Sequence, residues 1–126
     1  MSAKINKIPG PDHPIQIVRN QKRVSVTFGG KVIADTTDAL TLSESTYPKV
    51  QYIPRKDVDM GVLERSATKT YCPYKGEASY FSIHSGEARA ADAIWTYETP
   101  YAAVAEIKDH LAFYPDRVDT IEERDA

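Results

Sequence analysis

Residues 23–36 constrain the fold of this chain more than any other segment. Two runs rich in β-branched residues, Val-Ser-Val-Thr-Phe and Lys-Val-Ile-Ala-Asp-Thr, flank Gly29-Gly30, a pair that tolerates the positive φ of a tight turn. In the first run apolar residues alternate with Ser25 and Thr27, and successive side chains of a strand point to opposite faces. The pattern predicts a hairpin with one buried face and one face at least partly in water.

Similar strand-like runs recur along the chain. Leu40 and Leu42 alternate with polar residues, and Pro54 ends the run that contains Tyr52. Residues 55–63 have no clean period, which indicates a turn with at most a short helical piece. Strands are expected to begin at Ile15 and to span residues 40–43, 50–53, 68–72, 78–83 and 93–97, with a further turn at Ser85-Gly86. The expected fold class is mainly β (α+β), built from antiparallel sheets.

One helix is predicted near the carboxyl end of the sequence. Thr99-Pro100 offers an N-cap residue followed by proline at the first helical position, where its missing amide proton costs nothing. Val104, Ile107 and Leu111 then follow at spacings of three and four residues, which would place them on one helical face. We expect this C-terminal helix to pack on the sheet and to end before Pro115.

The remaining segments complete a single expected domain, residues 1–126. A chain of this length can bury a genuine core. Residues 1–14 are rich in Pro, Gly and Asn and are expected to form an irregular N-terminal arm. Residues 119–126 are mostly charged and are expected to form a frayed tail.

The composition argues against several kinds of partner. The 16 basic residues face 18 acidic ones scattered along the chain, so no nucleic acid is expected. No apolar run has the length of a signal peptide or of a membrane span, so we expect a cytoplasmic protein without membrane contact. A single cysteine allows neither an internal disulfide nor a four-thiolate zinc site. His13, His84 and His110 lack ligand spacing, so no metal and no cofactor is expected.

Residues 68–82 hold the candidate catalytic groups. Cys72 is the only cysteine and Lys75 follows it in a Cys-Pro-Tyr-Lys-Gly turn between two strand-like runs. A lysine or a turn rich in backbone amides can lower the pKa of a thiol and make it a nucleophile. The alternative is a buried thiol that acts as a small hydrophobe. For Lys75 the alternative is an ordinary salt bridge with Glu44, Asp57 or Glu77.

Aromatic residues on or beside the predicted strands are candidates for a binding surface. They could line a concavity with flat surfaces and polar tips, or they could simply pack in the core and across strands. Arg55, at a strand end, could bind a carboxylate or phosphate through its planar guanidinium, or it could brace a loop. The aromatic candidates are Tyr52, Tyr71, Tyr74, Tyr80, Trp95 and Tyr97, of which we assign Tyr52, Tyr80, Trp95 and Tyr97, with Arg55, to ligand binding.

Several short motifs occur in one order along nearly the whole chain. They are Gly10-Pro11-Asp12-His13-Pro14-Ile15, residues 24–35 around Gly29-Gly30, Tyr52-Ile53-Pro54-Arg55-Lys56-Asp57-Val58, Cys72-Pro73-Tyr74-Lys75-Gly76, Ala93-Ile94-Trp95-Thr96-Tyr97 and Leu111-Ala112-Phe113-Tyr114. In these motifs the chain resembles the family catalogued as domain of unknown function 427, a group of small, mostly bacterial proteins. Family members often have tryptophan where this chain has Phe81.

The resemblance implies an antiparallel β domain related in topology to the β-tent folds, among them methionine sulfoxide reductase B. It does not imply the activities of those relatives, because fold does not fix function. Their zinc-binding Cys-x-x-Cys pairs are absent from this sequence. No reaction is carried over from the family.

Three functional hypotheses follow. The first is a small-molecule-binding β domain, with or without catalysis, whose pocket lies around the Cys-Pro-Tyr-Lys-Gly turn. The alternative is a structural or protein-interaction module that forms a homo-oligomer and has no catalysis. A third hypothesis, redox sensing by Cys72, requires glutathione or a second subunit to supply the other sulfur.

Overall fold

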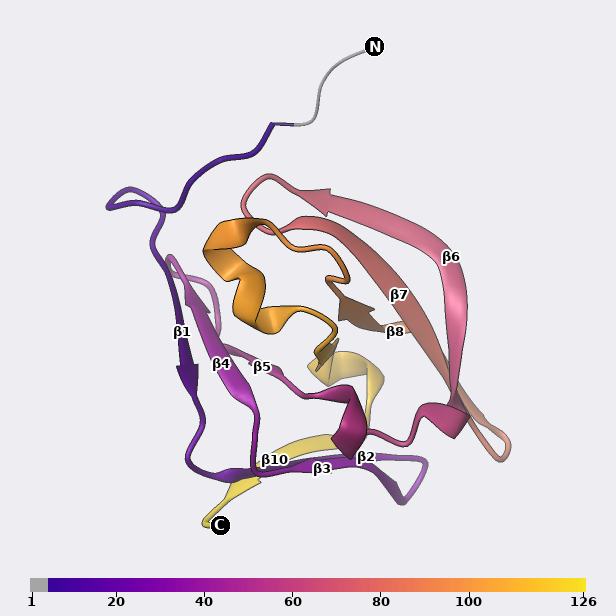
Figure 1. The fold of residues 1–126 in the computed structure, drawn as a ribbon. Helices are drawn as coiled ribbons and strands as arrows, with labels where there is room; N and C mark the ends of the chain where they lie inside the picture. Colours follow the sequence, from indigo (N-terminus) through magenta and orange to yellow (C-terminus); the bar gives the residue numbers. More distant parts are fainter. Residues whose placement is uncertain (1–4) are drawn as a thin grey trace.

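The structure, a computed structural model that describes residues 5–126, is mainly β and contains three antiparallel sheets (Figure 1). The first sheet has the order β1 (Ile15–Arg19), β4 (Leu40–Glu44), β5 (Val50–Tyr52). The second has the order β10 (Thr120–Arg124), β2 (Arg23–Phe28), β3 (Lys31–Thr36). The third has the order β6 (Leu63–Cys72), β7 (Gly76–Ser85), β8 (Ala88–Thr96), β9 (Leu111–Phe113).

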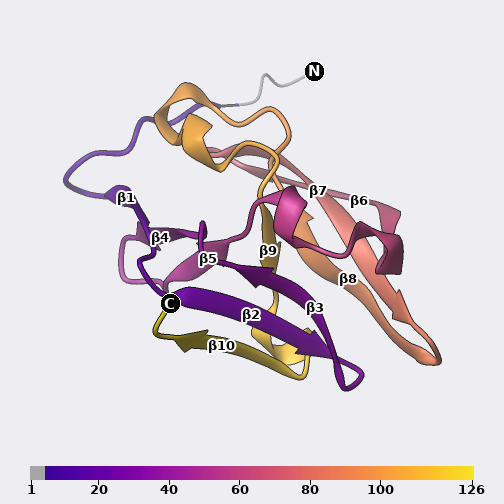
Figure 2. The ribbon, with the colours of Figure 1, turned by 60° about the horizontal axis from the view of Figure 1, so that its bottom comes forward.

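The predicted hairpin is confirmed as β2 and β3. Gly29 and Gly30 have φ of 59° and 78°, the left-handed region that glycine enters without a steric penalty. The apolar side chains of β2 are buried, as the alternation predicts. Ser25 on the other face is also buried, and its hydroxyl accepts a hydrogen bond from Arg124. Arg124 belongs to β10, the strand that lies beside β2 (Figure 2).

Other predicted strands are confirmed with shifted boundaries, and the run predicted at 50–53 ends one residue earlier, at Tyr52. The run that starts at Thr68 begins earlier, at Leu63, and the run at Ala93 begins at Ala88. The early part of β8 is Ala-Arg-Ala-Ala-Asp, which has little β propensity of its own and is held by pairing with β7. Residues 55–62 form the expected turn, with short 3-10 segments at Arg55–Asp57 and Met60–Val62, and Leu63 already belongs to β6.

The predicted C-terminal helix is wrong. Ala102–Ile107 forms only 3-10 turns, broken at Val104 by non-helical φ and ψ of −126° and 26°. The backbone amide of Tyr101 donates to Lys75 O and that of Asp109 to Tyr97 O, so both ends of the segment are tied to the third sheet. A segment this short has little helical stability of its own, so these contacts decide its path. Val104 and Ile107 are nevertheless fully buried, as their spacing suggested.

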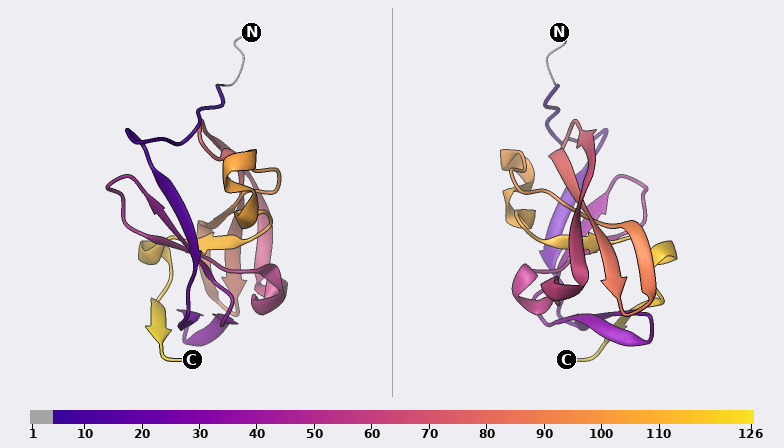
Figure 3. Two further views of the ribbon diagram at one scale, coloured as in Figure 1. Left: turned by 60° about the vertical axis from the view of Figure 1, so that its left-hand side comes forward. Right: turned by 90° about the vertical axis from the view of Figure 1, so that its right-hand side faces the viewer.

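The predicted frayed tail is also wrong, because residues 120–124 form β10. This strand pairs antiparallel with β2, and Ile121 packs against the hydrophobic core. The backbone hydrogen bonds with β2 and the burial of Ile121 stabilise this strand. The charged composition of the segment gives no local sign of it. At the other end of the molecule (Figure 3), residues 5–14 form no strand, only a bridge between Gly10 and His13. Residues 1–4 of the expected arm lie outside the described part.

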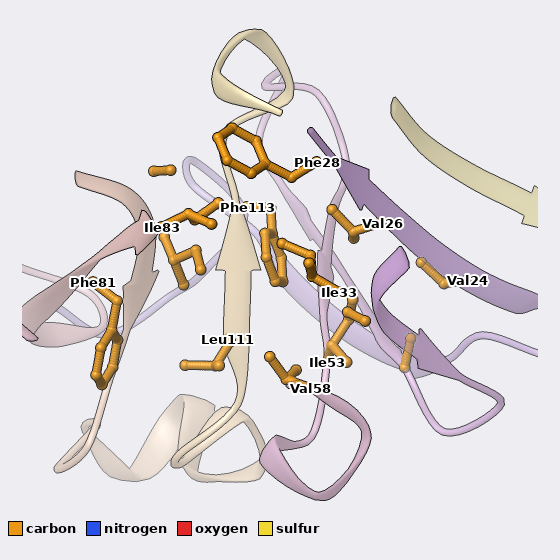
Figure 4. Packing of buried hydrophobic residues seen from close by; sticks show 14 residues of the cluster. Val24, Val26, Phe28, Ile33, Ile53, Val58, Phe81, Ile83, Leu111 and Phe113 are labelled. Atoms are coloured by element: carbon orange, nitrogen blue, oxygen red, sulfur yellow. The ribbon is translucent and has the colours of Figure 1, made fainter. Parts of the chain in front are cut away.

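The short strand β9 lies at the centre of the core. Its Leu111 and Phe113 lie between Phe81 and Ile83 of the third sheet and the β2–β3 hairpin (Figure 4). Leu111 also exchanges two backbone hydrogen bonds with Ile53, at 2.7 and 2.8 Å, so β9 joins the first sheet to the third. Within residues 5–126 the structure has no helix with the length and apolarity of a membrane span.

Candidate functional site

A cavity of about 940 Å³ opens where the three sheets approach one another. The β4–β5 hairpin forms one side, β7 and β8 form another, and residues 113–115 and 119–122 close the third. Its charged lining residues are Glu44, Lys49, Lys75, Asp119 and Glu122, and its aromatic lining residues are Tyr47, Tyr52, Tyr80, Trp95, Tyr97, Phe113 and Tyr114. The wall is therefore mainly aromatic and apolar, with charge at a few points.

The rings on this wall hold one another in place. Trp95 meets Tyr52 edge to face with centroids 6.3 Å apart, and its Nε1 donates to Tyr52 Oη at 3.1 Å. Tyr114 packs against Trp95 at 4.5 Å between centroids, and the Arg117 guanidinium covers the Tyr114 ring at 4.6 Å. Edge-to-face and cation–π contacts of this kind add to the energy of burial. The aromatic wall is therefore a fixed surface with defined hydroxyl positions.

Tyr52 and Tyr97 are the most buried phenols of this wall, with 1% and 6% of their surface exposed. Burial is the main cause that raises the pKa of each hydroxyl far above the usual value of a tyrosine. The negative charge of Glu44 acts in the same direction on both. Both phenols therefore keep their protons over the whole physiological pH range and can donate hydrogen bonds.

Lys75 and Glu44 form an ion pair at the cavity wall. Lys75 is only 7% exposed and donates to Glu44 Oε1, while His13 Nε2 lies 2.7 Å from Glu44 Oε2. Burial would raise the pKa of Glu44, but the hydrogen bonds with Lys75 and His13 outweigh it and hold the pKa below its ordinary value. The structure thus selects Glu44 among the partners expected for Lys75. His13 in turn stacks on Tyr74 at 4.0 Å.

Cys72, the other catalytic candidate, lies beside this pair and not on the cavity wall. It ends β6, is half-buried, and its Sγ lies 3.8 Å from Lys75 Nζ. The backbone turns back through Gly76, whose φ of 108° is the reason glycine is needed there. The structure therefore brings Cys72 and Lys75 together, but the ammonium of Lys75 donates a hydrogen bond to the Glu44 carboxylate. Nucleophilic chemistry and redox sensing by Cys72 stay predictions.

Arg55 lies away from the cavity and braces a loop, the alternative expected from the sequence. Its Nε donates to Asp109 O at 2.8 Å, and it shares the carboxylate of Glu98 with Arg65 at 3.1 and 2.9 Å. Both guanidiniums also face the Phe81 ring. Arg55 therefore has structural partners already. Tyr71 and Tyr74 also lie outside the lining, with the Tyr71 hydroxyl donating to Ile5 O.

Low pH should reduce the free energy of unfolding, because the Glu98 carboxylate becomes protonated. Hydrogen bonds from Arg65 and then Arg55 lower the pKa of this carboxyl to about 2, against the effect of its partial burial. Because this pKa lies below that of an unfolded glutamate, the stabilisation is complete above about pH 5 and is lost as the pH falls toward 2. We expect Glu98→Gln to make the unfolding free energy less dependent on pH between 5 and 3.

Urea denaturation of the wild type and the variant at several pH values in that range measures this effect. Glu87→Gln, at an exposed turn position, is the matched control and should follow the wild type. Parallel curves for the wild type and Glu98→Gln would contradict the assignment of acid sensitivity to this carboxyl.

The structure adds residues to the site that sequence reasoning missed. Tyr114 and Tyr47 line the cavity, and His13 supports the Glu44 carboxylate from the N-terminal arm. Tyr114 directly follows the buried Leu-Ala-Phe of β9, so a strand prediction there could have placed it at the site. The helix predicted to end before Pro115 took the place of that strand prediction. His13 had no local signal. Among the described residues no group of three or more His, Cys, Asp or Glu side chains could hold a metal ion.

Comparison with known proteins gives a family and no activity. A family model described as "Domain of unknown function (DUF427)" matches residues 16–124. No curated protein matches the chain. The match covers every strand except the first residue of β1, and therefore all sides of the cavity.

Proposed function

Since the chain belongs to the DUF427 family, whose description assigns no activity, we propose its function from the cavity itself: the protein binds a small molecule there. The observation that carries this proposal is the convergence of Tyr52, Tyr80, Trp95, Tyr97 and Tyr114 on one hollow. Three sheets around a hollow also support, as part of the proposal, the β-tent-like architecture that the resemblance implies.

The size and lining of the cavity support this proposal. A volume of about 940 Å³ lies within the range of typical small-molecule sites, roughly 300–1,000 Å³. Such sites combine apolar and aromatic walls with a few polar groups that orient the ligand. Here Lys75, Glu44 and the tyrosine hydroxyls are the polar groups. The ligand that fits this surface is flat and mostly apolar, because rings gain contact area against rings.

Binding can be followed through Trp95, the one tryptophan of the sequence. In ¹H–¹⁵N spectra the chain gives one indole signal, from the Nε1–H that donates to Tyr52 at the cavity wall. We expect saturable shifts of this signal with at least one of three fused bicyclic probes: naphthalene, coumarin and 2-naphthoate. Proposed binding at this site fails if none of the three moves the signal at millimolar concentration.

A charge placed on the wall tests the location. Val50→Glu puts a carboxylate into an apolar part of the lining, where its desolvation opposes binding, so we expect at least tenfold weaker binding of the probes. Val18→Glu makes the same change on β1, at a 48% exposed position outside the lining, and should bind as the wild type does. Equal losses in both variants would place the probes elsewhere. The amide spectra of both variants report whether they are folded.

The homo-oligomer without catalysis stays the competing proposal, with less support. The large apolar side chains exposed on the described surface lie on the arm, β1, β3 and the β4–β5 turn, so no single strand presents them. The long edge strand β6 carries Glu64, Arg65 and Lys69, and charged side chains on an edge oppose pairing with a second copy.

A further inference from the structure

We propose that the ligand carries a neutral hydrogen-bond acceptor, in the manner of a carbonyl group on a flat ring compound, and that the hydroxyls of Tyr52 and Tyr97 hold it. This inference rests on the proposed function and names the chemical class of its ligand. It depends on two phenol protons that have no acceptor within the described part of the protein.

Tyr97 supplies the first donor. Its hydroxyl makes no hydrogen bond to any described residue, although the side chain is only 6% exposed. In the same part of the chain every fully buried side-chain nitrogen or oxygen has a partner. The Tyr97 hydroxyl therefore keeps some open surface, and the cavity that Tyr97 lines is the open space beside it. The proton of this hydroxyl can therefore be donated to a molecule that enters the cavity.

Tyr52 supplies the second donor. Its oxygen accepts from Trp95 Nε1 at 3.1 Å, which leaves its own proton without an acceptor among residues 5–126. Tyr52 and Tyr97 belong to the same buried cluster and both line the cavity. Burial raises the pKa of both, so each remains a neutral donor. A hydroxyl donates one proton and a carbonyl oxygen has two lone pairs, so one carbonyl can accept from either hydroxyl or from both.

The charges around these donors favour a neutral acceptor over an anion. Glu44 acts on both hydroxyls with its negative charge, and the lining holds three acidic residues against two lysines. The ammonium of Lys75 already serves Glu44. A carboxylate on the ligand would therefore meet repulsion that a carbonyl avoids. A cation is disfavoured at this point of the cavity for a different reason: the two phenol protons give it no acceptor, and both carboxylate oxygens of Glu44 are already engaged, by Lys75 and His13.

The three bicyclic probes separate these cases, since they share a ring size and differ in polar group. Naphthalene has no acceptor, coumarin has a neutral carbonyl and 2-naphthoate has a carboxylate. We expect the wild type to bind coumarin about tenfold more tightly than naphthalene, the effect of one or two hydrogen bonds. Tyr97→Phe and Tyr52→Phe should each reduce this preference, measured as the ratio of coumarin affinity to naphthalene affinity within the same variant. Tyr74→Phe, which removes a hydroxyl outside the lining and keeps the ring that stacks on His13, is the matched control and should keep the preference.

Each outcome bears on a different claim. Equal binding of coumarin and naphthalene, or a coumarin preference that survives in both phenylalanine variants, overturns the proposed donor pair and leaves the binding function intact. Tightest binding of 2-naphthoate overturns the neutral acceptor. Absence of all binding overturns the proposed function on which this inference rests. The backbone amide spectrum shows whether each variant keeps the native fold, because Tyr52→Phe itself removes the acceptor of the Trp95 indole N–H. The two variants are independent tests of the same pair.

Discussion

Glu44→Gln should lower the free energy of unfolding by about 3 kcal/mol, as expected when one partner of a buried ion pair is removed. The ammonium of Lys75 would remain in a nearly buried site without its anion, and its only other hydrogen-bond contact among residues 5–126 is Cys72 Sγ at 3.8 Å. His13 would lose the same carboxylate. Urea denaturation at pH 7 measures the loss.

Two further variants separate the charge from the shape of the site. Glu64→Gln makes the same substitution at an exposed position of β6 and should change stability by less than about 0.5 kcal/mol. The double variant Glu44→Leu with Lys75→Met removes both charges and should recover much of the stability, because an apolar pair of similar size avoids desolvation. A loss below about 1 kcal/mol in Glu44→Gln would show that the pair is more hydrated than its burial indicates.

Leu111→Ala should destabilise the protein by about 3 kcal/mol, within the range of leucine truncations in well-packed cores. Leu111 is fully buried, and its side chain belongs to the cluster shared by the third sheet and the β2–β3 hairpin. Two backbone hydrogen bonds between Leu111 and Ile53, in the segment after β5, hold β9 in place. The backbone therefore cannot shift to fill the cavity that the truncation leaves.

Val32→Ala is the matched control for this truncation. Val32 also lies in a strand but is 53% exposed, so the expected change is within about 0.5 kcal/mol. Urea denaturation of the two variants gives the comparison. Similar losses in both would contradict a central role for β9 in the core.

The sequence was sufficient to predict the hairpins, because their signals are local. Gly29-Gly30 and the alternating run before it specify a turn and a buried face without help from distant residues. Val104 and Ile107 illustrate the opposite case. Their spacing marks the residues that are buried, but a spacing of three and four does not distinguish a helix from 3-10 turns tied to a sheet. β10 had almost no local signal and depends on its partner β2.

The candidate site also contains some residues that the sequence could place and others that needed the fold. Trp95 and Tyr97 lie two positions apart, so strand periodicity alone could place both on one wall. The choice of Glu44 as the partner of Lys75 needed the fold, since Asp57 and Glu77 were equally open in the sequence. Cys72 and Arg55 show the limit of residue type as a guide. Both have reactive or charged groups, yet neither lines the cavity.

The position of β10 has a consequence for protein synthesis. Residues 119–122 close one side of the cavity and Ile121 covers part of the core, while their partner β2 is made about a hundred residues earlier. On the ribosome β2 and β3 can pair, but the edge of β2 stays open until residue 124 has emerged. A nascent chain therefore exposes an unpaired strand edge and an incomplete cavity wall until that point, and a chain stalled before β10 presents an edge that can pair with another chain.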